Sequence, residues 1–173
     1  MYDNASIALY PENAIIGPDS FRQMAEHPNI HGIKASSGDL RLFHEYERIA
    51  RETGGKAFIG NEKLMSKSIS RHAVPSMANI FPQFCREFMD VIAEGSREQR
   101  REYQRCMDER GMRIYSDYTK IHGGIMYALK IRGICCSEPL GPDQELTCKE
   151  KKDIALYVSG LEDRMTRFSD QTM

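Results

Sequence analysis

The chain has 173 residues, with 24 lysines and arginines against 25 aspartates and glutamates, and 40% of its residues are hydrophobic. This length suits a single domain over residues 1–173, and a net charge of −1 argues against broad electrostatic attraction to nucleic acid or to an anionic membrane. No run approaches the roughly 20 apolar residues of a membrane span. The acidic start Met1–Asn4 differs from a secretion signal, so we expect a soluble, cytoplasmic protein.

The first half of the chain alternates between predicted helices and short predicted strands. In chain order, a helix is expected at 18–27, a strand at 30–34, a helix from 39 to 54, a strand at 56–59, a helix from about 62, and a strand-like run at 72–77. This alternation is typical of parallel strands joined by right-handed crossovers. Residues 1–95 therefore predict an α/β class built from βα units.

The second half predicts helices only. Pro82 suits the first turn of a helix that ends at Gly95. Ser96 and Gln99 have the spacing of a capping box, which predicts a long helix reaching about Tyr118. Further helices are expected at 124–132 and 147–160, with a loop at 133–146 and a frayed tail after 164. Residues 96–164 are therefore predicted to be C-terminal helices.

Polar or small residues follow each predicted strand directly. These segments are Lys34–Asp39, Gly60–Glu62 and Ser76–Asn79. Binding and catalytic groups gather at the carboxyl ends of strands in open α/β sheets and in (β/α) barrels alike. The sequence thus predicts a site at this end of the sheet.

Lys34 is the most informative of these residues, because it ends an otherwise apolar strand. A solvated lysine amine is protonated at neutral pH, whereas partial burial disfavours the charged form and leaves an amine able to attack a ketone and form a Schiff base. The alternative from spacing alone is a lysine that caps the strand and reaches water. Ser36, Ser37 and Gly38 precede a helix N-terminus, where backbone N–H groups favour a substrate carboxylate or hydroxyl; simple capping by Ser37 or Asp39 remains compatible with this.

One block of sequence resembles a known family. Pro28–Asp39, read as Pro-Asn-Ile-His-Gly-Ile-Lys-Ala-Ser-Ser-Gly-Asp, is similar to the "HPNIxGIKxxSGD" block of the dihydrodipicolinate synthase/N-acetylneuraminate lyase family. Weaker resemblances follow the same order along the chain: Tyr2-Asp3-Asn4 to a "YNxP" strand end, Gly60-Asn61-Glu62 to a "GxD/GxE" turn, and Ser76–Pro82 to "SGLANVFP". These proteins are class I, Schiff-base aldolases and lyases on a (β/α)8 barrel.

The resemblance implies a role for each matched residue. Lys34 would form the imine with pyruvate or a related 2-keto acid, and the Tyr2 phenol would relay protons. Ser36, Gly60, Glu62 and Ser76 would contact the hydroxyl-bearing end of the substrate. For Tyr2, an aromatic side chain packing on a neighbour is the alternative. The reaction implied is reversible cleavage or condensation of a carbon–carbon bond with an aldehyde partner.

The chain also departs from the family. A (β/α)8 barrel takes about 250 residues, so we expect a partial TIM barrel that holds the later strands and the C-terminal helices and lacks the earlier strands. Two alternatives follow: a 2-keto-3-deoxy-sugar-acid dehydratase of the same superfamily, or an inactive truncated relative that serves as a structural or regulatory partner. The resemblance further implies a homo-oligomer and no cofactor. The five cysteines lack Cys-x-x-Cys spacing, so no metal site is predicted.

Overall fold

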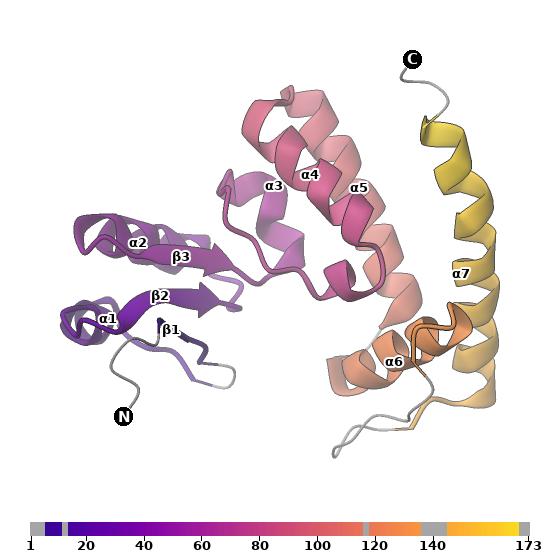
Figure 1. Ribbon diagram of the computed structural model, residues 1–173, viewed down its shortest axis with the longest axis horizontal. Coiled ribbons are helices and arrows are strands. Elements are labelled where there is room, and N and C mark those ends of the chain that lie inside the picture. The colour runs from indigo at the N-terminus through magenta and orange to yellow at the C-terminus, as the bar shows by residue number, and fades with distance from the viewer. Residues whose placement is uncertain (1–5, 12–13, 116–117, 136–144, 170–173) are drawn as a thin grey trace.

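Three parallel strands form the sheet in the part of the chain that the structure describes. The computed structural model describes residues 6–11, 14–115, 118–135 and 145–169. The strands are β1 (Ile7–Leu9), β2 (Ile30–Ala35) and β3 (Lys56–Ile59), in the order β1-β2-β3 (Figure 1). Both pairings are parallel, as the alternating sequence predicts. The α/β class is therefore confirmed, and β1 is an element that the sequence analysis missed.

The strand predicted at 72–77 is wrong. Only Ala73 continues the sheet, through a parallel bridge to Ile59. Pro75 has no N–H to donate to a ladder, and the chain then turns into a 3-10 helix, η2 (Ser76–Asn79). The sheet therefore has a fourth parallel position, but that position is one bridge long.

Two helices cover one face of the sheet. They are α1 (Pro18–Ala25) and α2 (Leu40–Glu52), both at predicted positions. The side chains of Phe43, Tyr46 and Ile49 on α2 are buried, because they recur at helical spacing on the side that packs against the strands. Asp39 caps α2 by accepting hydrogen bonds from the Arg41 and Leu42 amides at 2.8 and 3.2 Å.

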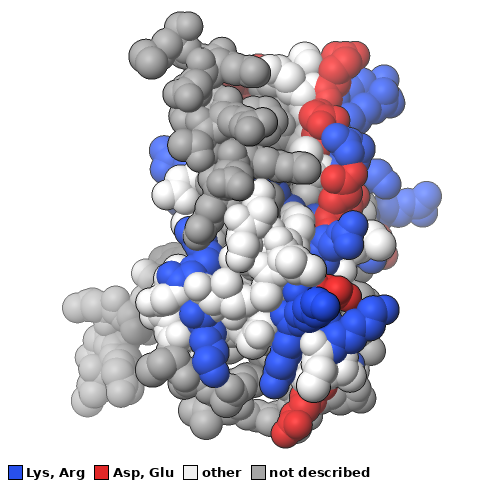
Figure 2. Space-filling view, turned by 90° about the vertical axis from the view of Figure 1, so that its right-hand side faces the viewer, with Lys and Arg blue, Asp and Glu red and all other residues white. Residues whose placement is uncertain are grey.

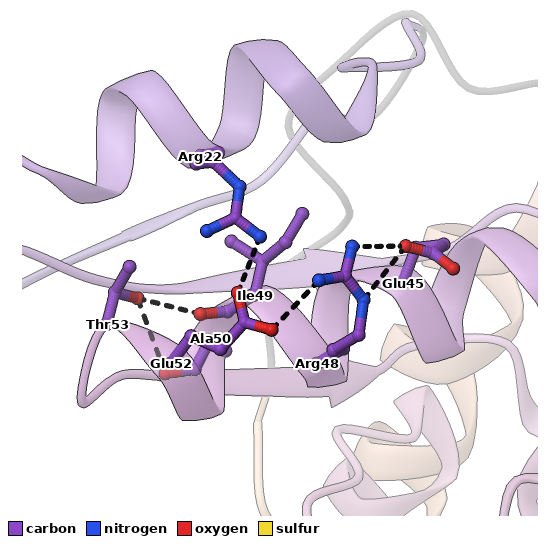
Figure 3. Close-up of polar contacts among 7 residues, drawn as sticks. All are labelled: Arg22, Glu45, Arg48, Ile49, Ala50, Glu52 and Thr53. Carbon is purple, nitrogen blue, oxygen red and sulfur yellow. Dashed lines mark hydrogen bonds and ion pairs between the residues drawn. The ribbon is translucent and has the colours of Figure 1, made fainter.

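A chain of ion pairs joins α1 to α2 (Figure 3). Arg22 on α1 donates to Glu52 at 2.5 Å, and Arg48 bridges Glu52 and Glu45 at 2.8 and 2.7 Å. The two guanidinium groups lower the pKa of the Glu52 carboxyl. These side chains are exposed to solvent, so the network contributes little stability.

The second half of the chain is a helical layer beside the sheet (Figure 1). Its short helices are η1 (Glu62–Leu64), α3 (Met65–Ser68) and η3 (Tyr118–Lys120). Its longer helices are α4 (Pro82–Glu94), α5 (Arg97–Ile114), α6 (Ile121–Ile131) and α7 (Cys148–Ser169). Phe88, Ile92, Met107 and Val158 are buried between these helices. On the face shown in Figure 2, acidic and basic side chains lie close to one another around a patch of uncharged residues.

Helix boundaries follow the local sequence with three exceptions, one of which is that α6 begins at Ile121 rather than near 124. The predicted capping box is present, since the Ser96 side chain accepts from the Gln99 amide and Gln99 accepts from the Ser96 amide. Helix α5 ends at Ile114 rather than near 118. At Ile114, the backbone of Gly124 on α6 approaches the Ile114 carbonyl so closely that a side chain at position 124 would not fit. Helix α7 continues to Ser169, beyond the predicted end at 160. Within the described parts of the chain, no helix is both long and apolar enough to cross a membrane.

Ile69 is the single non-glycine residue with positive φ among the described residues, at +52°. A β-branched side chain in the left-handed region costs roughly 1–2 kcal/mol. Its side chain is 59% exposed, so it gains little from burial. We expect Ile69→Gly to raise the free energy of unfolding by about 0.5–1 kcal/mol, after allowing for the freedom of glycine in the unfolded chain. Urea unfolding measures this, with Ile69→Ala as the control that keeps the strain; equal stability of both variants would contradict it.

Candidate functional site

The two faces of the sheet have different surroundings. Ile33, Ala57 and Ile59 point to the face covered by helices and are at most 3% exposed. Because side chains alternate along a strand, Gly32, Lys34 and Phe58 point to the opposite face, where Lys34 is aligned with Phe58. We call this the inner face. It carries the candidate site.

Lys34 lies near the carboxyl end of β2 on the inner face and is half-buried. Its Nζ stands 3.9 Å from the centroid of the Tyr10 ring. No ion pair between Lys34 and a carboxylate is present among the described residues. Within the described part of the chain, the Lys34 amine is therefore held by an aromatic face rather than by an acidic partner.

Gly60 and Ser36 complete the immediate surroundings of Lys34. A Cβ placed on Gly60 would lie 2.6 Å from Lys34 Cε and 2.6 Å from Ser36 Oγ. The Gly60 amide also donates to the Ala35 carbonyl at 2.7 Å, which keeps this approach fixed. Two predicted residues of the block around Lys34 thus lie close to a third, Gly60, from the turn after β3, at one end of the sheet.

We expect Gly60→Ala to displace the Lys34 side chain, because neither contact at 2.6 Å leaves room for a methyl group. The backbone of Gly60 needs no positive φ, so the fold should survive. The expected result is at least about a tenfold loss in the rate at which Lys34 is modified by a carbonyl reagent, since misplacement by about 1 Å is costly in such sites. Gly38→Ala, at a glycine with open space around it, is the matched control. An unchanged rate in Gly60→Ala would show that the close approach of Gly60 to the Lys34 side chain is not needed for the reaction of Lys34.

Glu62 and Ser76 form the next layer of the site. Glu62 Oε1 accepts a hydrogen bond from the Met77 amide at 2.8 Å, and the Tyr115 hydroxyl donates to Oε2. The Glu62 carboxylate thereby ties η2, which begins at Ser76, to the end of α5. Both Glu62 carboxylate oxygens therefore already accept hydrogen bonds from the protein, whereas the sequence predicts a contact between Glu62 and substrate.

Burial raises the pKa of the Glu62 carboxyl above its usual value, although hydrogen bonds from Tyr115 and Met77 oppose the rise. The folded protein then binds this proton more tightly than the unfolded chain does. Its contribution to stability is full below the unfolded pKa and is lost as pH rises through the folded pKa.

At low pH, Glu62→Gln should have a lower free energy of unfolding than the unchanged protein. We expect this difference to become smaller as the pH increases from about 4 to 8. Urea unfolding at several pH values gives the difference in free energy. Glu98→Gln serves as the control, because the Glu98 carboxyl is exposed and its pKa is lowered by local hydrogen bonds. A difference for Glu62→Gln that moves the opposite way with pH would contradict a buried, hard-to-ionise carboxyl.

Tyr10 is the residue that the sequence analysis missed. It directly follows β1, and its ring is 49% exposed beside the Lys34 amine. Tyr2, the predicted proton relay, lies outside the described residues. The signal that could have found Tyr10 is the short apolar run Ile7-Ala8-Leu9 immediately before it.

The loop after Lys34 is organised mainly by its own contacts. Asp39 accepts from the first amides of α2, so the predicted simple capping is confirmed for Asp39. Asn61 donates from Nδ2 to the Ser37 carbonyl at 3.3 Å and links the loop to the end of β3. Among the described residues, no group of three histidine, cysteine or acidic side chains is arranged to hold a metal ion.

Comparison with known proteins identifies a family that the sequence matches. The model of the dihydrodipicolinate synthetase family matches residues 10–159. The chain is 24% identical over 149 residues, 84% of its length, to 4-hydroxy-tetrahydrodipicolinate synthase of Archaeoglobus fulgidus, and 30% identical over 90 residues, 50% of its length, to the enzyme of that name from Methanospirillum hungatei. These alignments cover 50% and 31% of the two relatives, so the chain spans half of their length or less.

Solved structures show the same fold. Dihydrodipicolinate synthase from Bacteroides thetaiotaomicron superposes with a TM-score of 0.78 at 20% identity, covering 90% of this chain and 56% of that one. The sialic acid aldolase of Ruminococcus gnavus also gives 0.78, at 18% identity, covering 93% of this chain and 57% of its own. With the family model matching most of the sequence, the chain belongs to the dihydrodipicolinate synthetase family of aldolases and lyases.

Proposed function

We propose that the chain supplies the later strands of a (β/α)8 barrel and acts as a Schiff-base lyase on pyruvate or a related 2-keto acid. The observation that carries this proposal is the Lys34 amine, half-buried at the end of β2 and 3.9 Å from the Tyr10 ring, with Gly60 packed against its side chain. A lysine at the carboxyl end of a parallel strand, with no carboxylate partner among the described residues, is suited to form an imine with a ketone.

In the proposed reaction the unprotonated Lys34 nitrogen attacks the C2 carbonyl of the keto acid. Loss of water gives an imine, whose protonated form accepts the electron pair released when the neighbouring carbon–carbon bond breaks. In the reverse direction, the enamine adds to the aldehyde partner and water then releases the product from Lys34. No cofactor is required, because the imine itself is the electron sink.

Tyr10 takes the role that the sequence analysis gave to Tyr2. A phenol next to the amine can donate a proton to the leaving hydroxide during imine formation and return one during hydrolysis. Its partial exposure leaves the hydroxyl accessible to substrate. Ser36 and Ser76 would hydrogen-bond the hydroxyl-bearing end of the substrate, and Gly60 would leave room for it. Glu62 would act by holding the turn that begins at Ser76.

Reduction by borohydride in the presence of pyruvate tests this proposal. The imine is reduced to a stable secondary amine, so mass spectrometry of the intact protein should show one added group per chain. A folded protein that gains no mass would contradict it and favour the inactive, structural relative. Product analysis with aldehyde partners, beside an assay for dehydration of 2-keto-3-deoxy sugar acids, separates carbon–carbon chemistry from the dehydratase alternative.

A further inference from the structure

One row of side chains crosses the inner face of the sheet at the level of Lys34. Lys34 on β2 is aligned with Phe58 on β3. The parallel bridge from Ile59 to Ala73 continues this register, so His72 lies beside Phe58. Because side chains alternate along a strand and Ile59 points to the covered face, both Phe58 and His72 point to the inner face. The row therefore carries a nitrogen-bearing side chain on each side of Phe58.

The His72 imidazole is held in position by an aromatic ring and by its own backbone. It packs edge-on against the Phe58 ring, with centroids 5.7 Å apart and an angle of 78° between the ring planes. The His72 carbonyl accepts a hydrogen bond from the Ile59 amide at 2.9 Å, and the His72 amide donates to Ser70 Oγ at 3.3 Å. Among the described residues, its ring nitrogens form no hydrogen bond or ion pair. A half-buried imidazole in this state can offer its polar atoms to a ligand.

The positions of Lys34 and His72 decide which part of a substrate each can contact. The Lys34 amine lies beside Tyr10, which follows β1, whereas His72 lies beyond β3. Neighbouring strands are about 4.8 Å apart, so the Cα atoms of Lys34 and His72 are roughly 10 Å apart. A substrate joined to Lys34 at its keto carbon must extend past Phe58 before it meets His72. The group that contacts His72 therefore belongs to the far end of the substrate.

The charge of the sheet favours a negative group at that end. None of the residues in β1, β2, β3 or the 72–74 segment is acidic. Glu62, the acidic residue of the site, already accepts hydrogen bonds with both carboxylate oxygens. An imidazole N–H donates well to a carboxylate, and protonation of the ring strengthens this contact. A phosphate, with about two charges and three acceptor oxygens, needs more donors than one imidazole supplies.

We propose that His72 is a specificity-determining residue of the lyase, which hydrogen-bonds a carboxylate at the far end of the aldehyde partner. The proposal rests on the proposed function and names its substrate class: an aldehyde with a terminal carboxylate several carbons from its carbonyl. His72 takes no part in making or breaking the carbon–carbon bond, which occurs at Lys34. Its effect therefore falls on the choice among aldehydes and leaves imine formation with pyruvate unchanged.

Two aldehydes of equal carbon number test this choice. Succinic semialdehyde ends in a carboxylate and butanal in a methyl group, and kcat/KM is measured for each in condensation with pyruvate. We expect His72→Phe, which keeps a ring against Phe58 but loses the donor, to reduce the preference for succinic semialdehyde about 10- to 100-fold. His72→Gln keeps a donor and should retain most of the preference. His31→Phe, at an exposed histidine on the opposite face of β2, is the matched control and should leave it unchanged.

Binding of succinate tests the same contact without any imine. In nuclear magnetic resonance spectra of the chain with isotope-labelled histidine, the His72 signal is identified by its loss in His72→Gln. The proposal predicts a saturable shift of this signal with succinate and none with succinamide, which is neutral. Circular dichroism checks that each variant is folded.

Two results would overturn the role of His72: an unmoved His72 signal in the folded chain, or an unchanged aldehyde preference in His72→Phe. The binding measurement separates this proposal from the proposed chemistry. A succinate-dependent shift without imine trapping would refute the chemistry alone, and imine trapping with an unmoved signal would refute the role of His72 alone.

Discussion

Lys34→Met is expected to reduce trapping of pyruvate by borohydride to background. Methionine keeps the length and apolar stem of lysine at this half-buried position, so the sheet should fold unchanged. The nitrogen that would form the imine is lost, and none of the described residues placed beside it, Tyr10, Gly60 and Ser36, carries an amine that could replace it. Intact-protein mass after reduction measures the effect.

Lys56→Met is the matched control for this variant. Lys56 is also on the sheet, at the start of β3, and is exposed at the end opposite to the candidate site. It should trap pyruvate as the unchanged protein does. If Lys34→Met retained the adduct while Lys56→Met lost it, the imine would be placed on the wrong lysine.

Tyr10→Phe is expected to slow imine formation and any aldol reaction by about 10²–10⁴-fold, the usual contribution of a positioned acid–base group. The phenylalanine ring still lies over the Lys34 amine, so the cation–π contact and the position of Lys34 persist. The loss should therefore fall on the rate, with little change in the folded stability. Stopped reduction at a series of times after mixing with pyruvate gives that rate.

Tyr2→Phe distinguishes the two tyrosines. The family resemblance implies that Tyr2 relays protons, whereas the structure places Tyr10 beside Lys34. We expect Tyr2→Phe to retain the rate within about twofold, since the proposed mechanism gives the proton transfer to Tyr10. A large loss in Tyr2→Phe together with full activity in Tyr10→Phe would return the role to Tyr2.

The elements that the sequence predicted well are those with a long periodic pattern. The spacing of Phe43, Tyr46 and Ile49 predicts the buried face of helix α2. The capping box of Ser96 and Gln99 predicts the start of helix α5. Strand β1 has only three residues, two of them exposed, so it offers no alternation to detect. The run at 72–77 is apolar enough for a strand, but Pro75 interrupts pairing after one bridge.

The part of the candidate site that the sequence predicts consists of residues directly after apolar runs, because such runs mark the ends of strands. Lys34, Ser36 and Gly60 each follow an apolar run, and the parallel topology brings such ends to one edge. The engagement of Glu62 was not predictable, because its hydrogen-bond donor Tyr115 lies 53 positions away and is placed by the packing of α5. Tyr10 escaped because its position depends on β1.

The most direct measurement for the whole account is peptide mapping of the protein after reduction with borohydride in the presence of pyruvate. Proteolysis and tandem mass spectrometry identify the lysine that carries the reduced adduct. The account predicts a single modified site, Lys34, in a protein that remains folded throughout. An adduct spread over surface lysines such as Lys56, or a folded protein with no adduct at all, would contradict it.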